Sequence, residues 1–385
     1  MTPKRRPATA AVHGGRPPQL PGSPVVPPVH RSVIYEFETA EQFAHVMEDS
    51  DRGYLYSRIR NPSTDELAAV LAELEGAEAA LCYASGMAAI SAALELLAPP
   101  GTVVVAAEQL YGQTYALLRG RRPETRFVDL ADEAAVGRAL DGARLLYAET
   151  ISNPLVRVPD LARLAAAARA AGIRMAVDNT MATPVGCRPL PLGVDLVLHS
   201  ATKYLNGHSD VLAGIAAGSG NLVAELARRQ LDSGATLAPD SAWLVRRGIK
   251  TLHLRWQRCS ENALVIARFL EADDRAERVL YPGLESHPDH AVAARLLEGC
   301  GGVLAFDARG GRPGAERVMD AVSLCLRATS LGGVDTAISH PASTSHRQLS
   351  ADELRAVGLS EATLRLTVGC EDAADLIADL DQALR

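Results

Sequence analysis

Short apolar runs alternate with helical segments between about residues 60 and 220, and this alternation constrains the fold more than any other feature. The clearest segments are four apolar runs and two helical stretches: 103–107, 145–149, 175–178, 196–199, 65–77 and 161–171. Continuous apolar runs of this length are typical of parallel strands that helices cover on both faces. We therefore expect an α/β protein whose main domain is a doubly wound, mostly parallel sheet.

A smaller α+β domain is expected in the C-terminal part. A long helical region, 243–272, has a break marked by Gly248 and precedes further apolar runs and helical stretches: 279–281, 303–307, 364–368, 290–297, 314–321 and 372–384. We divide the chain into an N-terminal arm (1–60) that contacts a neighbouring subunit, a large domain (61–250) and a C-terminal domain (251–385). The first 28 residues contain eight prolines, which indicates a flexible or extended segment.

Composition excludes several classes of function. Lys and Arg number 39 against 46 Asp and Glu, so a net charge of −7 with no basic stripe argues against a nucleic-acid partner. No apolar run reaches the roughly 18 residues of a membrane span. The six cysteines form no C-x-x-C pair, so we expect neither a metal site nor a disulfide framework. A reducing cytoplasm is the expected location.

Lysine is rare in this chain. Only Lys4, Lys203 and Lys250 are lysines, and the other 36 basic residues are arginines. Because guanidinium cannot act as an amine nucleophile, a lysine retained in such a chain is a candidate for amine chemistry. The alternative for Lys203 is an ordinary surface lysine after a strand. No lysine completes a phosphate loop, and no G-x-G-x-x-G follows an early strand, so a nicotinamide-dependent oxidoreductase is not favoured.

Polar residues follow the apolar runs, where parallel sheets bind ligands. Glu149, Asp178 and the segment 199–203 stand at these ends. Lysine forms a Schiff base with an aldehyde, and an acid that faces a pyridine nitrogen keeps that nitrogen protonated. Asp178 with Lys203 is therefore the pattern of a pyridoxal 5′-phosphate (PLP) site, and Ser200 and Thr202 supply hydroxyls for the phosphate.

A second phosphate-binding element is predicted at residues 84–90. Ser85, Gly86 and Met87 follow an apolar run and open a helical stretch. Small residues at a helix N-terminus expose backbone N–H groups to an anion. Many helices begin with Ser-Gly, so this pattern is weak when taken alone.

The chain from about residue 12 onward resembles the Cys/Met-metabolism PLP enzymes, which include cystathionine γ-synthase, cystathionine lyases, methionine γ-lyase and the O-acylhomoserine sulfhydrylases. The resemblance rests on the lysine signature in 178–184 and 199–210 and on further motifs: 56–62, 85–89, 110–112, 149–154, 281–288, 330–333 and 365–372. It implies PLP fold type I, with a seven-stranded, mostly parallel sheet in the large domain.

The resemblance also implies a role for each matching residue. Lys203 holds PLP and then acts as acid and base, Asp178 pairs with the pyridine nitrogen, and Tyr111 stacks on the ring and assists proton transfer. The phosphate is bound within the subunit by Gly86, Met87, Ser200 and Thr202. Tyr56 and Arg58 reach the phosphate of a neighbouring subunit. The substrate carboxylate is surrounded by Arg365, Ser330 and Asn153. The assembly implied is a homotetramer of dimers with shared active sites. Each of these residues also has a simpler interpretation when taken singly. Tyr56 and Arg58 fit a pair on a surface loop, Tyr111 fits a core aromatic, and Arg365 fits an ordinary arginine on a strand.

Three departures from the family pattern concern the distal part of the substrate. Gln113 stands where the family has a small residue or, in methionine γ-lyases, a cysteine. Asp335-Thr336 replaces the usual Glu-Ser, and the usual Met is missing from 343–346. We therefore expect methionine to be a poor substrate, with Gln113 and Asp335 addressing a polar or charged tail.

The expected reaction is γ-replacement on an activated homoserine through a vinylglycine quinonoid, as in cystathionine γ-synthase. The alternatives are γ- or β-elimination of the cystathionine-lyase type, and γ-substitution with a non-standard nucleophile. A non-catalytic PLP-binding protein is the alternative from a different class. Intact Lys203, Asp178 and Arg365 count against that last alternative.

Overall fold

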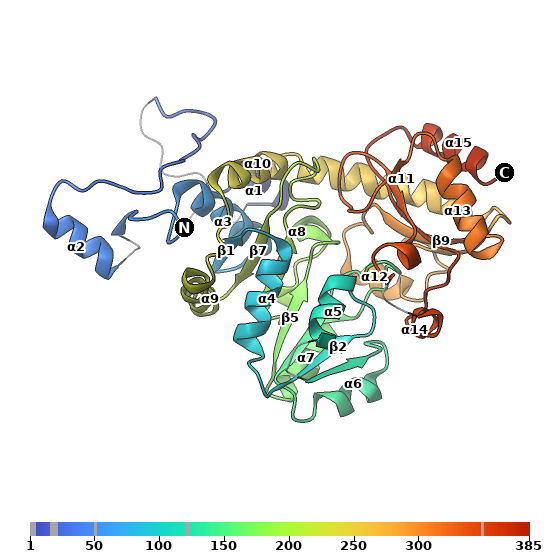
Figure 1. Ribbon diagram of the computed structural model, residues 1–385, viewed down its shortest axis with the longest axis horizontal. Coiled ribbons are helices and arrows are strands. Elements are labelled where there is room, and N and C mark those ends of the chain that lie inside the picture. Colours follow the sequence, from blue (N-terminus) through green and yellow to red (C-terminus); the bar gives the residue numbers. More distant parts are fainter. Residues whose placement is uncertain (1–4, 16–21, 50–51, 121–123, 348–349) are drawn as a thin grey trace.

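The computed structural model describes residues 5–15, 22–49, 52–120, 124–347 and 350–385. It contains two sheets, and Figure 1 shows them with their helices side by side, the C-terminal part on the right and helix α2 standing away on the left. Of the described residues, no helix is long and apolar enough to cross a membrane.

The larger sheet has seven strands in the order β1-β7-β6-β5-β4-β2-β3. Its strands are β1 (Ala79–Tyr83), β2 (Val103–Ala107), β3 (Glu124–Val128), β4 (Leu145–Glu149), β5 (Arg174–Asp178), β6 (Leu196–Ser200) and β7 (Gly214–Gly218). Only β7 runs antiparallel to its neighbours. The expected mostly parallel α/β sheet is confirmed, and the expected runs coincide with β2, β4, β5 and β6 to within one residue.

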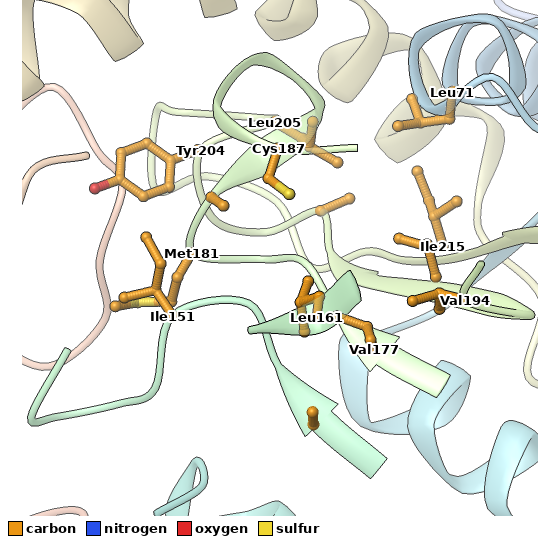
Figure 2. Close-up of a cluster of buried hydrophobic side chains, with 14 of the residues drawn as sticks. Leu71, Ile151, Leu161, Val177, Met181, Cys187, Val194, Tyr204, Leu205 and Ile215 are labelled. Carbon is orange, nitrogen blue, oxygen red and sulfur yellow. The ribbon is translucent and has the colours of Figure 1, made fainter. Parts of the chain in front are cut away.

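Helices cover both faces of this sheet because alternate strand residues point to opposite sides. Residues such as Val104, Leu145 and Tyr147 pack against one set of helices: α4 (Gly86–Leu97), α5 (Gly112–Gly120) and α9 (Gly220–Ser233). Neighbours such as Val105 and Leu146 pack against the other set: α1 (Pro7–His13), α3 (Pro62–Glu75), α6 (Glu133–Leu140), α7 (Leu161–Ala170) and α10 (Pro239–Ile249). Figure 2 shows part of this second cluster, with Val177 and Ile215 on strands and Leu71 and Leu161 on helices.

Local sequence sets where the site-bearing helices begin. Asn61 caps α3 by accepting from the Ser63 N–H, and Ser85 caps α4 by accepting from the Ala88 N–H. Such caps satisfy N–H groups that lack a partner in the first helical turn. The cap at Ser85 fixes the point at which the chain leaves β1 and presents the α4 N-terminus at the edge of the sheet.

The smaller sheet has the order β10-β11-β12-β9-β8. Its strands are β8 (Ala276–Leu280), β9 (Val303–Ala308), β10 (Leu326–Arg327), β11 (Ala337–Ser339) and β12 (Thr363–Thr367). The helices of this half are α11 (Leu252–Glu271), α12 (His290–Leu296), α13 (Gly311–Ala321), α14 (Ala351–Ala356) and α15 (Ala373–Ala383), and the short helices elsewhere are α8 (Thr183–Gly186), η2 (Leu190–Leu192) and η3 (Pro341–Ser343). The expected helix break near Gly248 falls between α10 and α11, although the three-part division of the chain stays a prediction.

The N-terminal arm differs from the expectation. Residues 1–4 and 16–21 lie outside the described residues, but Pro7–His13 forms helix α1, and its Ala10 and Ala11 are buried in the core beside α3. The prediction of a flexible or extended arm is therefore wrong for this stretch, because two alanines are small enough for close helix packing. By contrast, α2 (Ala40–Glu48) buries only Val46.

Candidate active site

Lys203 lies just beyond the carboxyl end of β6, as expected for a residue that acts at the sheet edge. Its amine donates a hydrogen bond of 2.8 Å to the hydroxyl of Ser330, which comes from the segment before β11. Burial, assisted by the positive charge of Arg365, lowers the pKa of Lys203 to about 8. A lysine with this pKa is partly neutral near physiological pH and can act as a nucleophile.

Asp178 ends β5, the neighbour of β6, and its carboxylate is buried. One oxygen accepts the backbone N–H of Thr180 at 2.9 Å, and the Thr180 hydroxyl accepts the N–H of Ser200 at 2.7 Å. Burial raises the pKa of Asp178, against the hydrogen bonds from Thr180. Among the described residues, Asp178 forms no ion pair with a basic side chain. A protonated pyridine nitrogen would be a suitable partner for this buried acid.

The N-terminus of α4 lies against the end of β6. A Cβ atom placed on Gly86 would approach Ser200 Cβ to 2.7 Å, and one on Gly214 would approach Ser85 O to 2.0 Å. Only glycine permits this close approach, which brings the N–H groups at Gly86 and Met87 beside Ser200. Thr202 is near but its hydroxyl also bonds Ala213, accepting its N–H at 3.0 Å. These donors suit the phosphate of PLP.

Arg365 projects from β12, in the second sheet, toward the same edge. Its guanidinium donates to Ser330 O at 2.6 Å and to Asn153 Oδ1 at 3.0 Å. The side chain is 6% exposed, and its Nε has no hydrogen-bond partner in the described structure. Burial lowers the pKa of Arg365 to about 10, yet the group stays charged at neutral pH. A buried cation with a free donor is suited to a substrate carboxylate.

Glu149 connects two of the predicted site residues, although sequence analysis assigned it no role beyond its place at a strand end. Its carboxylate accepts the backbone N–H of Tyr111 at 2.7 Å and that of Asn153 at 3.2 Å. Burial, reinforced by the charge of Asp178, raises the pKa of Glu149 well above its usual range. Tyr111 is 37% exposed. Burial raises its pKa, and the positive charge of nearby Arg365 acts in the opposite direction.

Tyr56 and Arg58 do not join this group within the subunit. The guanidinium of Arg58 lies 5.6 Å from the centre of the Tyr56 ring and donates to the carbonyl oxygen of Leu231, in α9. Tyr56 is 39% exposed. Neither residue forms a hydrogen bond with Lys203 or with the N-terminus of α4 in the described structure.

A cavity of about 430 Å³ adjoins Ser330 and Thr202. Its walls include the carboxylate-bearing residues Asp210 and Asp335, and none of the described residues that line it is basic. Gln113, an exposed residue in the first turn of α5, is not part of these walls. The structure thus separates two of the three departures from the family pattern: Asp335 borders a cavity beside the site, whereas Gln113 does not.

Comparisons with known proteins identify the family of this chain. A family model described as Cys/Met metabolism PLP-dependent enzyme matches residues 8–385. An L-methionine gamma-lyase from Pseudomonas putida is 43% identical, over 98% of this chain and 97% of that protein. An O-succinylhomoserine sulfhydrylase from Pseudomonas aeruginosa is 39% identical, over 91% of this chain and 88% of that protein.

Solved structures agree as well. A crystal structure of cystathionine gamma synthase from Xanthomonas oryzae pv. oryzae, in complex with aminoacrylate and cysteine, has a TM-score of 0.93 and 36% identity. The match covers 99% of this chain and 98% of that chain. The expected family, fold and PLP cofactor are therefore confirmed, while the relatives are named as lyases, a sulfhydrylase and a synthase.

Proposed function

The chain belongs to the PLP-dependent enzymes of Cys/Met metabolism, and from this premise we propose that it catalyses γ-replacement on an activated homoserine. The observation that carries the proposal is the acidic cavity beside Ser330. A replacement reaction needs space for a second reactant at the distal end of the amino acid. A cavity of about 430 Å³ is within the range of small-molecule sites.

Lys203 is proposed to hold the cofactor and to move protons. Bound PLP supplies an electron sink that stabilises negative charge at the substrate Cα. Lys203 Nζ then takes the Cα proton, and the Ser330 hydroxyl orients this amine through the 2.8 Å hydrogen bond. Tyr111 is proposed to stack on the cofactor and to donate a proton from its hydroxyl to the leaving group, because its raised pKa keeps that oxygen protonated.

The remaining site residues are proposed to bind and orient the cofactor and the substrate. Asp178 is proposed to pair with the pyridine nitrogen, and the phosphate is proposed to lie among four residues of the subunit: Gly86, Met87, Ser200 and Thr202. Arg365 is proposed to bind the substrate carboxylate through its unpartnered Nε, while Asn153 and the Ser330 carbonyl hold its other nitrogens in place.

The negative charge of the cavity walls is proposed to determine which second reactant binds. Two carboxylates and no basic residue among the lining side chains favour a cationic group. A thiol that also carries an ammonium group, such as cysteine, fits this requirement. The same charges disfavour an anionic ester, so we expect O-acetylhomoserine to be used better than O-succinylhomoserine.

γ-Elimination is the second candidate, because the Pseudomonas putida relative at 43% identity is named a methionine gamma-lyase. Elimination and replacement share the departure of the γ-substituent and differ in whether a nucleophile then adds. An apolar thioether such as methionine gains nothing from Asp210 and Asp335. We therefore place elimination second.

A dimer is proposed to complete the site. Arg58 and Tyr56 are exposed and lie apart from the phosphate-binding residues of their own subunit, so they are proposed to bind the neighbour's phosphate. Large apolar side chains on the same arm are exposed in the single chain, as expected of a surface that a partner covers: Val33, Ile34, Phe43 and Met47. A tetramer built from two such dimers remains the proposed assembly.

The deciding experiment incubates the holoenzyme with O-acetylhomoserine, O-succinylhomoserine, cystathionine or methionine, each with and without cysteine. We expect cystathionine from O-acetylhomoserine and cysteine, with little 2-oxo acid. If methionine gives 2-oxo acid rapidly and cysteine is never incorporated, elimination is the function.

A further inference from the structure

Two thiols from distant parts of the chain are in contact beneath the segment that carries Ser330. Cys259 lies in α11, and Cys370 follows β12 by three residues. Their sulfur atoms are 3.8 Å apart, and both are free thiols. Cys259 is 1% exposed, whereas Cys370 is only partly buried. Cys370 is therefore the more accessible of the two thiols.

The surroundings of the two thiols favour different protonation states. The hydrogen bond between the two sulfurs lowers the pKa of Cys370, and the charges of Arg255 and Arg258 act in the same direction against burial and Glu371. That hydrogen bond and burial raise the pKa of Cys259. Because the thiolate is the form that attacks peroxides, Cys370 is the reactive member, and Cys259 retains its proton.

We propose that Cys370 and Cys259 are a redox-sensitive pair that forms a reversible disulfide and thereby weakens the binding of the amino-acid substrate. A hydroperoxide transfers one oxygen to the Cys370 thiolate, which gives a sulfenic acid and, after protonation, an alcohol or water. The Cys259 sulfur then attacks the Cys370 sulfur, and the hydroxyl leaves with the Cys259 proton as water. The two sulfurs lose two electrons, and the O–O bond of the peroxide accepts them.

Hydrogen bonds link this pair to the active site. The Cys370 N–H donates to Val334 O at 2.8 Å, and the Gly369 N–H donates to Thr336 Oγ1 at 2.9 Å. Glu371 accepts from the Thr336 hydroxyl at 2.8 Å. Segment 369–371 therefore holds segment 330–336, whose first residue, Ser330, contacts Lys203 and Arg365.

Formation of the disulfide requires movement. The sulfurs must approach from 3.8 Å to about 2.05 Å, so Cys370 is drawn toward α11. Asn262, in α11, donates to Gly369 O at 3.2 Å and to Glu371 O at 2.8 Å. These hydrogen bonds hold segment 369–371 against α11. The movement of segment 369–371 then displaces Val334 and Thr336 through their hydrogen bonds, and with them the segment that begins at Ser330.

The first test measures the bond itself. The holoenzyme is treated with hydrogen peroxide, unfolded and alkylated, and its peptides are analysed by mass spectrometry. We expect a linked peptide pair joining Cys259 to Cys370, which dithiothreitol separates. Cys259→Ser should instead trap the Cys370 sulfenic acid for a dione probe, and Cys370→Ser should abolish both products. Cys325→Ser, which changes a buried cysteine elsewhere in the same half, is the matched control and should behave as wild type.

The second test measures the coupling. Oxidation should raise the KM for O-acetylhomoserine by roughly fivefold, in the range typical of coupled sites, and leave the visible absorption of the cofactor unchanged. Dithiothreitol should restore the original KM, and Cys259→Ser and Cys370→Ser should lose the effect. The proposal is overturned if peroxide leaves both thiols free, or if the disulfide forms and KM does not change. A protein that forms the disulfide but does not turn over O-acetylhomoserine contradicts the proposed substrate instead, and KM is then measured with methionine.

Discussion

The amine of Lys203 donates a hydrogen bond of 2.8 Å to the hydroxyl of Ser330, a residue 127 positions later in the chain. Lys203 follows a strand of the seven-stranded sheet, whereas Ser330 lies between β10 and β11 of the second sheet. The carbonyl of the same serine also accepts from Arg365. Ser330 thus joins the amine of Lys203 to the proposed carboxylate-binding arginine, and its backbone is in the left-handed region at φ 87°.

Uptake of PLP by the apoenzyme should depend on pH through Lys203. Only the neutral amine attacks the aldehyde, and the pKa of Lys203 is lowered to about 8. The rate of appearance of the visible band should therefore plateau above about pH 8 and fall about tenfold per unit below it. Stopped-flow absorbance measures this rate. Lys203→Arg should give no band, and Lys250→Arg, which changes another lysine, should behave as wild type. A pH-independent rate would contradict this role.

Loss of the Arg365 side chain should impair substrate binding and leave the cofactor in place. Removal of one partner from a buried guanidinium–carboxylate pair costs roughly 2–4 kcal/mol. Arg365→Ala should therefore lower kcat/KM by about 30- to 1000-fold. The PLP content, measured by absorbance after release in alkali, should not change. If the variant instead loses PLP, Arg365 has a structural role.

Glu149 should act by positioning Tyr111 and Asn153. Glu149→Gln keeps one acceptor oxygen but places an amide NH₂ against one of the two backbone N–H groups, which costs about 1–3 kcal/mol for an unsatisfied buried donor. We expect kcat/KM to fall by about tenfold to 100-fold, with a higher KM because Asn153 also holds Arg365.

The control for Glu149 is Glu108→Gln, which changes an exposed acid just beyond the neighbouring strand β2. Its kinetics should match those of wild type. Thermal unfolding followed by circular dichroism separates a positioning effect from loss of the fold. Unchanged kinetics in Glu149→Gln would remove it from the site.

Active sites should be shared between subunits if Arg58 acts on the neighbour. Arg58→Ala and Lys203→Ala should each be nearly inactive alone. After the two variants are unfolded and refolded together, hybrid dimers should contain one intact site and recover about a quarter of wild-type activity, since half of the dimers are hybrids with one of two sites intact. A fully active monomer, or refolded hybrids without activity, would refute a shared site.

Asp335 rather than Gln113 should determine the preference for the second reactant. Asp335→Asn removes a charge from the cavity wall, so the preference for cysteine over an uncharged thiol should fall by about tenfold. Gln113→Gly is the matched comparison and should have a smaller effect, because Gln113 does not line the cavity. Competition assays with cysteine and 2-mercaptoethanol measure the ratio. If the double variant Gln113→Gly with Asp335→Glu also keeps the wild-type order of substrates, neither position sets specificity.

The sequence by itself determined the main sheet, the helices around it and the choice of Lys203 as the candidate nucleophile. Strand and helix periodicity are local properties, so the runs at β2, β4, β5 and β6 could be located without knowledge of the rest of the chain. The scarcity of lysine left three candidates for amine chemistry, and the hydroxyls of Ser200 and Thr202 favoured Lys203 among them. The family motifs then predicted PLP and a place for Asp178 close to the lysine, and the two residues follow neighbouring strands, β5 and β6.

Only the tertiary structure decided which residues lie together across long stretches of chain. The contacts of Ser330 with Lys203 and Arg365, the two N–H groups bound by Glu149, and the thiol pair of Cys259 and Cys370 join segments that no local pattern relates. The packing of α1 into the core overturned an expectation based on proline content, because two buried alanines outweighed the composition around them. These features depend on the packing of the two sheets, which is set by the whole chain rather than by any one segment.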